Sequence, residues 1–272
     1  HYATHYVALD AAAVPNMRTV LITDSSRSPR IPGVEVVSAK GLADFEDLKR
    51  IQESLSKLGI DPHWRNSYWS KIFMRYVLLG KLMESTREQG LVLQLESDVL
   101  SSLSPELLTS TIPHLDAGCY MPFIDNQTAG PGFMLALAPE HMVRACRFVV
   151  ETLQDQITFS DMAALGLAQG VELVKPLPSR GAESAIPINL GGGADAEEAD
   201  LVFDAAATGQ YLFGIDPRNN NGIIRPGYLE TRGGLDPGQW SDWQVQTTQD
   251  ERERVTCKME SGTAVFANIH VH

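Results

Sequence analysis

The chain contains few cysteines, few aromatic residues and fewer basic than acidic residues. Among its 272 residues are 3 cysteines, 7% aromatic residues, and 22 Lys and Arg against 34 Asp and Glu, which gives a formal net charge of -12. Cys119, Cys146 and Cys257 fit no metal-binding spacing and cannot all pair, so we expect buried thiols in a reducing compartment such as the cytoplasm. The negative charge argues against nucleic acid as a partner, although a bound cation would still allow an anionic substrate.

Long apolar runs and several enzyme motifs are also missing. No run approaches the roughly 18 apolar residues that span a bilayer, and no secretory signal is visible. We therefore expect no transmembrane segment, and at most a peripheral association with the inner face of a membrane. The triple glycine at 191–193 lacks the Lys-Ser/Thr of a phosphate-binding loop, and the dinucleotide fingerprint, the zinc-protease helix and the nucleophile elbow are absent.

Strand and helix patterns alternate along the chain. Strand-like runs occupy residues 18–24, 91–95 and 133–137, and helical patterns occupy residues 42–58, the segment from Asn66 or Ser67 up to Gly90, and segments begun by Pro139 and Ser160. This rhythm predicts an α/β fold with a mixed, mostly parallel sheet flanked by helices. No clean linker interrupts it, so we expect a single domain over residues 1–272, and the start at His1 without a Met suggests excision from a longer chain.

Two stretches are rich in turn-forming residues. Residues 176–200 mix Pro, Gly and acids and predict a long mobile loop, and residues 214–242 are again turn-rich. A short helix is expected between them, at about residues 201–212. Long loops in a compact domain are more often functional than idle, so we expect these two to shape a binding site or to act as a lid.

The most informative run ends in two acidic residues. Residues 91–95 are almost entirely apolar, which suits a strand buried on both faces of a parallel sheet. Glu96 and Asp98 follow, and side chains two apart in a strand share a side, so the two carboxylates can address one ligand together. Such a strand end in an open α/β sheet suits a hard divalent cation that holds a diphosphate. An ordinary acidic turn fits the same pattern.

Three further features are candidates for a site. Gly132 precedes a strand, where the absence of a side chain would let a ligand approach the backbone. Asp161 begins a helix, whose dipole favours an ionised carboxylate that can act as a base. His270 and His272 alternate in the strand-like run 265–272, and two imidazoles on one face can bind a metal or a phosphate. Each feature also has a purely structural explanation. Gly132 can belong to an ordinary turn, Asp161 can be a routine acid in the first turn of a helix, and the two histidines can lie on a polar surface.

In this order, the segments resemble a GT-A-type glycosyltransferase that uses nucleotide sugars, similar to bacterial surface-polysaccharide transferases. The run 93–98 resembles the DxD signature of that fold, written here Glu-Ser-Asp, and residues 69–76 resemble the aromatic and basic helix that leads into it. Residues 132–135 look like the strand that lines the donor sugar, residues 160–165 like the acidic helix start on the acceptor side, and residues 203–217 and 269–272 like further segments of such enzymes. The sequence departs from the pattern in Glu96, and in a first strand that falls at or before residues 1–10.

The resemblance implies a metal-dependent hexosyltransferase that moves a sugar from a nucleoside-diphosphate sugar to a glycan or lipid-linked acceptor. Asp98, with Glu96 helping directly or through water, would hold Mn²⁺ or Mg²⁺ against the donor diphosphate. His270 or His272 would complete the metal or phosphate site. Asp161 would activate the acceptor in an inverting enzyme, or position the sugar in a retaining one.

The resemblance also implies a donor site around the metal. Asp24, at the end of its strand, would contact the nucleotide base or ribose. Lys71 and Arg75 would offset phosphate charge, although a solvated helix face explains them as well. Ser97 and Gly132 complete this set.

Two other functions fit part of the pattern. A sugar-phosphate nucleotidyltransferase also needs a metal and a diphosphate, but it would require a Gly-rich basic loop after the first strand, and residues 24–27 match such a loop poorly. A carbohydrate-binding or scaffold domain would keep the fold without activity. Metal-dependent binding of a nucleotide sugar distinguishes a transferase from this last alternative.

Overall fold

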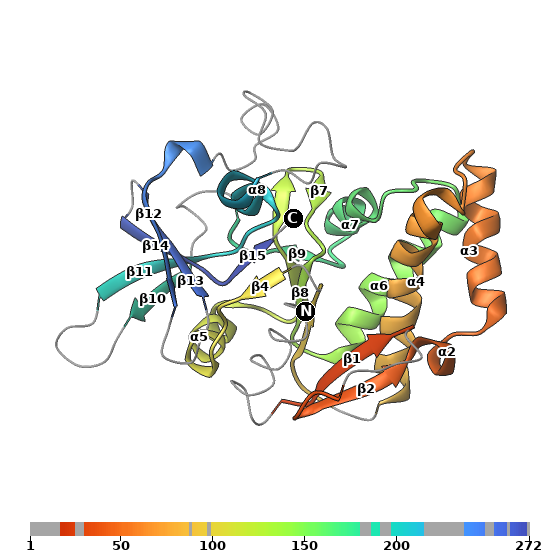
Figure 1. The fold of residues 1–272 in the computed structure, drawn as a ribbon, viewed down its shortest axis with the longest axis horizontal. Coiled ribbons are helices and arrows are strands. Elements are labelled where there is room, and N and C mark those ends of the chain that lie inside the picture. The colour runs from red at the N-terminus through yellow and green to blue at the C-terminus, as the bar shows by residue number, and fades with distance from the viewer. Residues whose placement is uncertain are drawn as a thin grey trace.

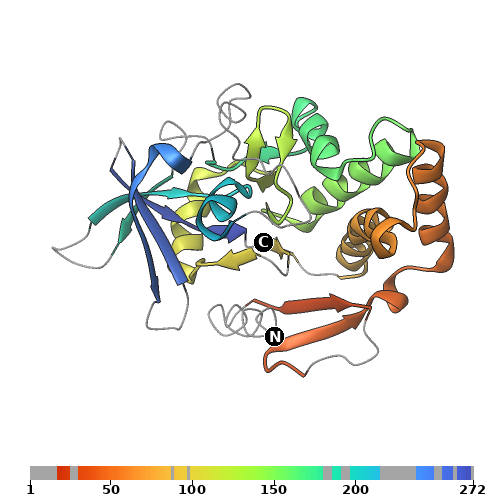
Figure 2. The same ribbon diagram turned by 45° about the horizontal axis from the view of Figure 1, so that its top comes forward.

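The computed structural model describes residues 17–24, 30–86, 89–96, 99–179, 186–190, 197–214, 237–247, 253–259 and 262–270. These residues form a mixed α/β structure with its long helices on one side and its largest sheet on the other (Figure 1). A smaller sheet lies between the two, and the β1–β2 pair lies beside the helices (Figure 2). The prediction of an α/β fold is thus confirmed at the level of class.

The helices of the structure include those expected from the helical patterns of the sequence. They are α2 (Ala39–Leu42), α3 (Phe45–Lys57), α4 (Trp64–Ser85), α5 (Pro105–Thr111), α6 (Pro139–Gln154), α7 (Asp161–Gly170) and α8 (Ala207–Phe213). Pro139 opens α6 as predicted, since a proline at the first helical position loses no hydrogen bond. The hydroxyl of Ser160 accepts from the backbone N–H of Ala163 at 3.3 Å and caps α7. The helix starts predicted at these two positions are therefore confirmed.

The strands form two larger sheets and three two-stranded pairs. One sheet has the order β3-β8-β5-β9, built from Val92–Leu95, Phe133–Ala136, Cys119–Met121 and Lys175–Pro176. The other has the order β10-β11-β14-β13-β12, built from Ile186–Leu190, Glu197–Val202, Gly262–Phe266, Glu253–Met259 and Ser241–Thr247. The pairs are β1–β2 (Thr19–Thr23, Val34–Ser38), β6–β7 (Phe123–Asp125, Thr128–Ala129) and β15–β4 (Asn268–His270, Val99–Ser101).

The strand pairing differs from the expected mostly parallel sheet. Among the strand pairs of the described residues, three are parallel and seven antiparallel. The prediction that residues 91–95 lie in a parallel sheet buried on both faces is wrong for β3. This strand is antiparallel to β8 at one edge of its sheet, and all four of its residues are partly exposed. An apolar run is compatible with either direction of pairing, so its composition could not decide between them.

Three expectations for the second half of the chain are wrong in part. Residues 186–190 and 197–202, expected in a mobile loop, pair as the antiparallel strands β10 and β11. The helix expected over 201–212 begins only at Ala207, because Leu201 and Val202 belong to β11. The expected terminal strand is divided at Ala267 into β14 and β15, which belong to different sheets.

Two packed interiors lie against the four-stranded sheet. The first lies between α3, α4, α6 and the four-stranded sheet, and includes Phe73, Tyr76 and Val149. The second lies between that sheet and the five-stranded sheet, where the rings of Phe133 and Phe203 lie 5.2 Å apart. Complete burial of such side chains stabilises the fold by about 1.5–3 kcal/mol each.

One helix contact depends on a glycine. Gly166 in α7 lies so close to the β6–β7 turn that a Cβ on this residue would overlap the carbonyl oxygen of Gln127. Gly170, at the end of the same helix, has nothing within 4 Å of its own ideal Cβ. The position of α7 against the turn therefore requires glycine at 166 and not at 170.

A carboxylate at the start of α3 gives the fold a predictable pH dependence. Asp44 and Asp47 form a reciprocal capping box, and Lys81 of α4 contacts the Asp47 carboxylate. Burial alone would raise the pKa of Asp47, but the bonds from Lys81 and from the Asp44 backbone lower it below its ordinary value of 3.8. A group with a lowered folded-state pKa stabilises the fold above its unfolded pKa and loses this effect as pH falls through the folded value.

We therefore expect Asp47→Asn to reduce the loss of stability on acidification. Urea unfolding at about pH 6 and about pH 3 should show a smaller fall in the free energy of unfolding for the variant, by about 1 kcal/mol or less because Lys81 is partly exposed. Glu46→Gln, which alters an exposed neighbour on α3, is the matched control and should keep the wild-type fall. Equal pH dependence in Asp47→Asn and wild type would contradict the assignment.

Candidate functional site

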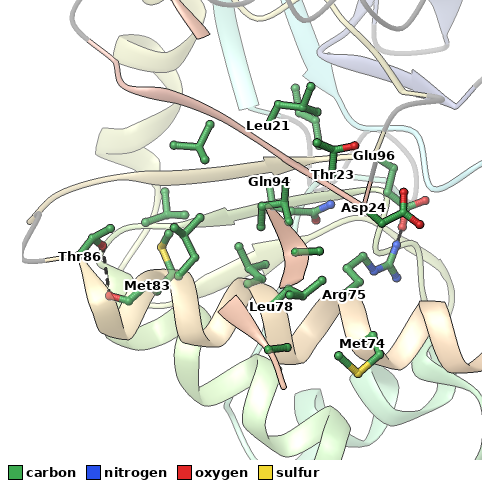
Figure 3. Close-up of a pocket in the computed structure, with 18 of the residues that line it drawn as sticks. Leu21, Thr23, Asp24, Met74, Arg75, Leu78, Met83, Thr86, Gln94 and Glu96 are labelled. Atoms are coloured by element: carbon green, nitrogen blue, oxygen red, sulfur yellow. Dashed lines mark hydrogen bonds and ion pairs between the residues drawn. The ribbon is translucent and has the colours of Figure 1, made fainter. Parts of the chain in front are cut away.

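A cavity lies where the two predicted strand ends meet the long helix α4. It has a volume of about 1320 Å³ and is lined by β1, β3, one face of α4 and residues of α2 and α3. Most of its wall is apolar, with Leu21, Leu78 and Met83 among the lining residues. Asp24, Arg75 and Glu96 gather at one end (Figure 3). The cavity thus combines a long apolar wall with a charged end, as ligand sites commonly do.

Arg75 links two acids that lie on different elements. Its guanidinium contacts the carboxylate of Glu96 at the end of β3, and its Nη2 donates to Asp161 Oδ2 at 2.7 Å. The hydroxyl of Tyr76 accepts from the same Nη2 at 2.8 Å and donates to Asp161 Oδ2, also at 2.8 Å. Three residues singled out in the sequence, Glu96, Arg75 and Asp161, are therefore brought together.

Burial strengthens the electrostatic coupling within this group. Asp161 is 5% exposed and Tyr76 is 1% exposed. Burial would lower the pKa of Arg75, but the neighbouring Tyr76 hydroxyl and the Asp161 carboxylate outweigh it and raise that pKa. Burial is also the main reason that the pKa of Tyr76 is raised well above its ordinary value, with Asp161 adding to it against the opposing effect of Arg75. Arg75 therefore stays a cation and Tyr76 a neutral donor.

Gly132 lies directly opposite Glu96. Its carbonyl oxygen accepts a hydrogen bond from the backbone N–H of Glu96 at 2.9 Å, which extends the β3–β8 ladder by one residue. This bond fixes the backbone of Glu96 at the charged end of the cavity.

The strand β15 brings the C-terminal histidine region to the same part of the molecule. It pairs antiparallel with β4, so that His270 lies opposite Val99. In the sequence, Val99 directly follows the predicted ligand Asp98. Two motifs separated by more than half of the chain therefore meet at one strand pair.

The remaining predicted residues divide into two sets. Asp24 and Lys71 line the cavity and are exposed. Ser97, Asp98 and His272 lie outside the described residues, and His270 is described only by its backbone. Within the described ranges, no group of three or more His, Cys, Asp or Glu side chains is placed to hold a metal ion.

Two residues of the site were not singled out in the sequence. The signal that could find Tyr76 is its hydroxyl, because the hydroxyl of a buried tyrosine needs a polar partner. Gln94 lines the cavity, and its side-chain carbonyl oxygen is buried and has no hydrogen-bond partner among the described residues. An acceptor of this kind in a cavity wall is a suitable partner for a ligand N–H or O–H.

The residues present allow a limited test of the expected Mn²⁺ or Mg²⁺. These cations prefer oxygen ligands, which carboxylates supply. The carboxylate of Glu96 is engaged by the Arg75 guanidinium, so a cation would have to share it. Glu96 therefore suits an auxiliary or water-mediated role, which leaves Asp98 as the predicted direct ligand.

Comparison with known proteins adds no relative. No protein-family model, curated protein or solved structure matches the chain. Among the described helices, none combines the length and the apolar character needed to cross a membrane. The functional argument therefore rests on the cavity, its charged end and the strand pairing beside it.

Proposed function

We propose that the protein is a metal-dependent glycosyltransferase with a GT-A-like fold, which transfers a hexose from a nucleoside-diphosphate sugar to a glycan or lipid-linked acceptor. The observation that carries the proposal is the junction of five predicted segments. Glu96 follows β3 and lies beside Gly132, Arg75 joins Glu96 to Asp161, and β15 sets His270 opposite the residue that follows Asp98.

The donor would bind along the cavity. Its charged end, with Arg75 and Lys71 among the lining residues, would accept the diphosphate, and Asp24 and Gln94 would bond the ribose or base. Arg75 has a further donor for this purpose, since its Nε is buried without a hydrogen-bond partner among the described residues. The cation held by Asp98, with help from Glu96 and a terminal histidine, would neutralise charge on the leaving nucleoside diphosphate.

Asp161 would act on the acceptor side. The bonds from Arg75 and Tyr76 hold one oxygen of its carboxylate in a fixed orientation. In an inverting reaction this carboxylate would take the proton of the acceptor hydroxyl, and in a retaining reaction it would position the sugar. In either case the Arg75 contact couples the donor end of the cavity to the acceptor side.

A thermal-shift panel of nucleoside diphosphates and their sugars, with and without Mn²⁺, tests the proposal. We expect one nucleotide class to stabilise the protein only with metal, since a ligand at about 100 times its Kd adds about 2.7 kcal/mol to the free energy of unfolding. Asp98→Ala should weaken this metal-dependent binding by about tenfold or more.

The control for this experiment is Asp155→Ala, which removes an exposed carboxylate at the end of α6 and should keep wild-type binding. Unchanged metal-dependent binding in Asp98→Ala would refute the proposed site. Absence of nucleotide-sugar binding in the wild-type protein would favour a non-catalytic carbohydrate-binding domain.

A further inference from the structure

A cluster of exposed aromatic rings lies at the start of α4. It consists of Trp64, Tyr68, Trp69 and Phe159, and is called here the aromatic platform. Trp64 is 41% exposed, Tyr68 48% and Phe159 38%. Large aromatic side chains are costly to leave in water, and exposed apolar groups gathered at one place commonly mark a binding surface.

The rings of the platform are fixed against one another. Trp64 and Trp69 are stacked with an angle of 17° between their planes and 6.2 Å between their centroids. The rings of Tyr68 and Trp69 meet edge-on, with 5.2 Å between their centroids. Phe159, just before α7, also meets the Trp69 ring edge-on, with 5.3 Å between centroids. The guanidinium of Arg65 lies 4.4 Å from the Trp64 ring centroid. The platform is therefore a preformed array with a cation at one side.

The backbone under the platform is strained. Arg65, Asn66 and Ser67 have φ values of 46°, 59° and 61°, in the left-handed region that residues other than glycine rarely enter because their Cβ is crowded there. The buried hydroxyl of Ser70 bonds the carbonyl of Pro62 at 2.9 Å and anchors this turn. A costly conformation that presents Trp64 and Tyr68 to solvent is typical of a ligand-binding segment.

The platform adjoins the proposed acceptor side. Phe159 lies two residues before Asp161, whose carboxylate is bonded to Arg75 and Tyr76. Trp69 touches Phe159 and belongs to the same helix as Arg75. A ligand whose reacting end lies at Asp161 would therefore extend over these rings.

The chemistry of the platform favours a neutral, hydroxyl-rich ligand. Sugar rings present a face of C–H groups that stacks on the electron-rich face of an aromatic ring. Exposed His63 and Asn66, together with Arg65, supply polar groups for hydroxyls beside the rings. A lipid surface is disfavoured because anionic headgroups would be repelled by a chain of net charge -12, although Ile157 is also exposed nearby in the sequence.

We propose that the aromatic platform binds a neutral stretch of a glycan, and that this glycan is the acceptor of the transfer reaction. The binding of sugar to the platform is independent of the proposed function, whereas its role as acceptor rests on it. Sugars farther along the glycan from the reacting hydroxyl would stack on Trp64 and Tyr68. The platform would thus select acceptors by their length.

The test is binding of the full chain to an array of immobilised neutral hexasaccharides of glucose, galactose and N-acetylglucosamine, without nucleotide or metal. We expect at least one of them to bind and to change tryptophan fluorescence in solution. Trp64→Ala combined with Tyr68→Ala should weaken this binding by about tenfold. Trp64→Tyr alone keeps an aromatic ring at position 64 and leaves Tyr68 intact, so this variant should retain most of the wild-type binding.

Phe213→Ala provides the matched control, since Phe213 is an equally exposed aromatic residue on α8. It should bind like wild type. Failure of every hexasaccharide to bind, or unchanged binding after loss of both rings, would overturn the proposal. The proposal would also be overturned if the protein bound phosphatidylcholine vesicles in a way that depends on Trp64 while it bound no sugar. Metal-dependent binding of the nucleotide sugar should stay at the wild-type level in the same variants. This second measurement tests the proposed function separately from the aromatic platform.

Discussion

Replacing Arg75 with Met will lower the free energy of unfolding by about 3 kcal/mol. The substitution keeps much of the aliphatic stem but leaves the carboxylates of Glu96 and Asp161 without their shared cation. An uncompensated carboxylate in a buried position is far more costly than the loss of an exposed ion pair. Urea unfolding at neutral pH measures the change.

Two further variants make this prediction specific. Arg147→Met removes an arginine that pairs with Glu84 at 3.1 Å while both side chains are largely exposed, and should cost about 1 kcal/mol or less. Adding Asp161→Asn to Arg75→Met removes one of the two stranded charges and should recover part of the loss. A cost for Arg75→Met no larger than that for Arg147→Met would show that Arg75 does not hold the two elements together.

The second large effect is expected at Gly166. Its replacement by Ala places a methyl group against the Gln127 carbonyl oxygen, so α7 or the β6–β7 turn must move. Overpacking against backbone is costly because neither partner can turn away, and we expect a loss of about 3 kcal/mol in the free energy of unfolding.

Gly170→Ala is the matched substitution in the same helix. It adds the same methyl group where nothing lies within 4 Å, and should be neutral or stabilise by up to about 1 kcal/mol, because alanine favours helix. Thermal unfolding of both variants gives the comparison. Similar melting temperatures for the two variants would mean that α7 tolerates displacement from the turn.

Helix starts and buried helix faces could be predicted from the sequence because their signals act within a single element. Pro139 and Ser160 act on the helix that they begin, and the helical spacing of Ile51 and Leu55 buries one face of α3. Such signals need only neighbouring residues. Strand partners are different, because β10 and β11 gain their stability from each other and from β14 rather than from their own turn-rich composition.

The site shows the same division. Glu96 and Asp161 are predicted from the strand end and the helix start to which they belong, and Arg75 from the resemblance of residues 69–76 to a glycosyltransferase helix. Their contact, across α4, β3 and α7, depends on how these elements pack. The partners of the Tyr76 hydroxyl likewise depend on packing, so the sequence alone does not indicate them.

The pairing of β15 with β4 has a consequence for synthesis of the protein. Val99 of β4 pairs with His270 of β15, so the two strands are far apart in the sequence. Such contacts form late in folding because a long loop must close first. During translation, β4 leaves the ribosome long before β15 exists. A nascent chain would therefore contain the residues of its cavity and of its Arg75 cluster before those of β15, and the proposed transferase activity should appear only when β15 has been released.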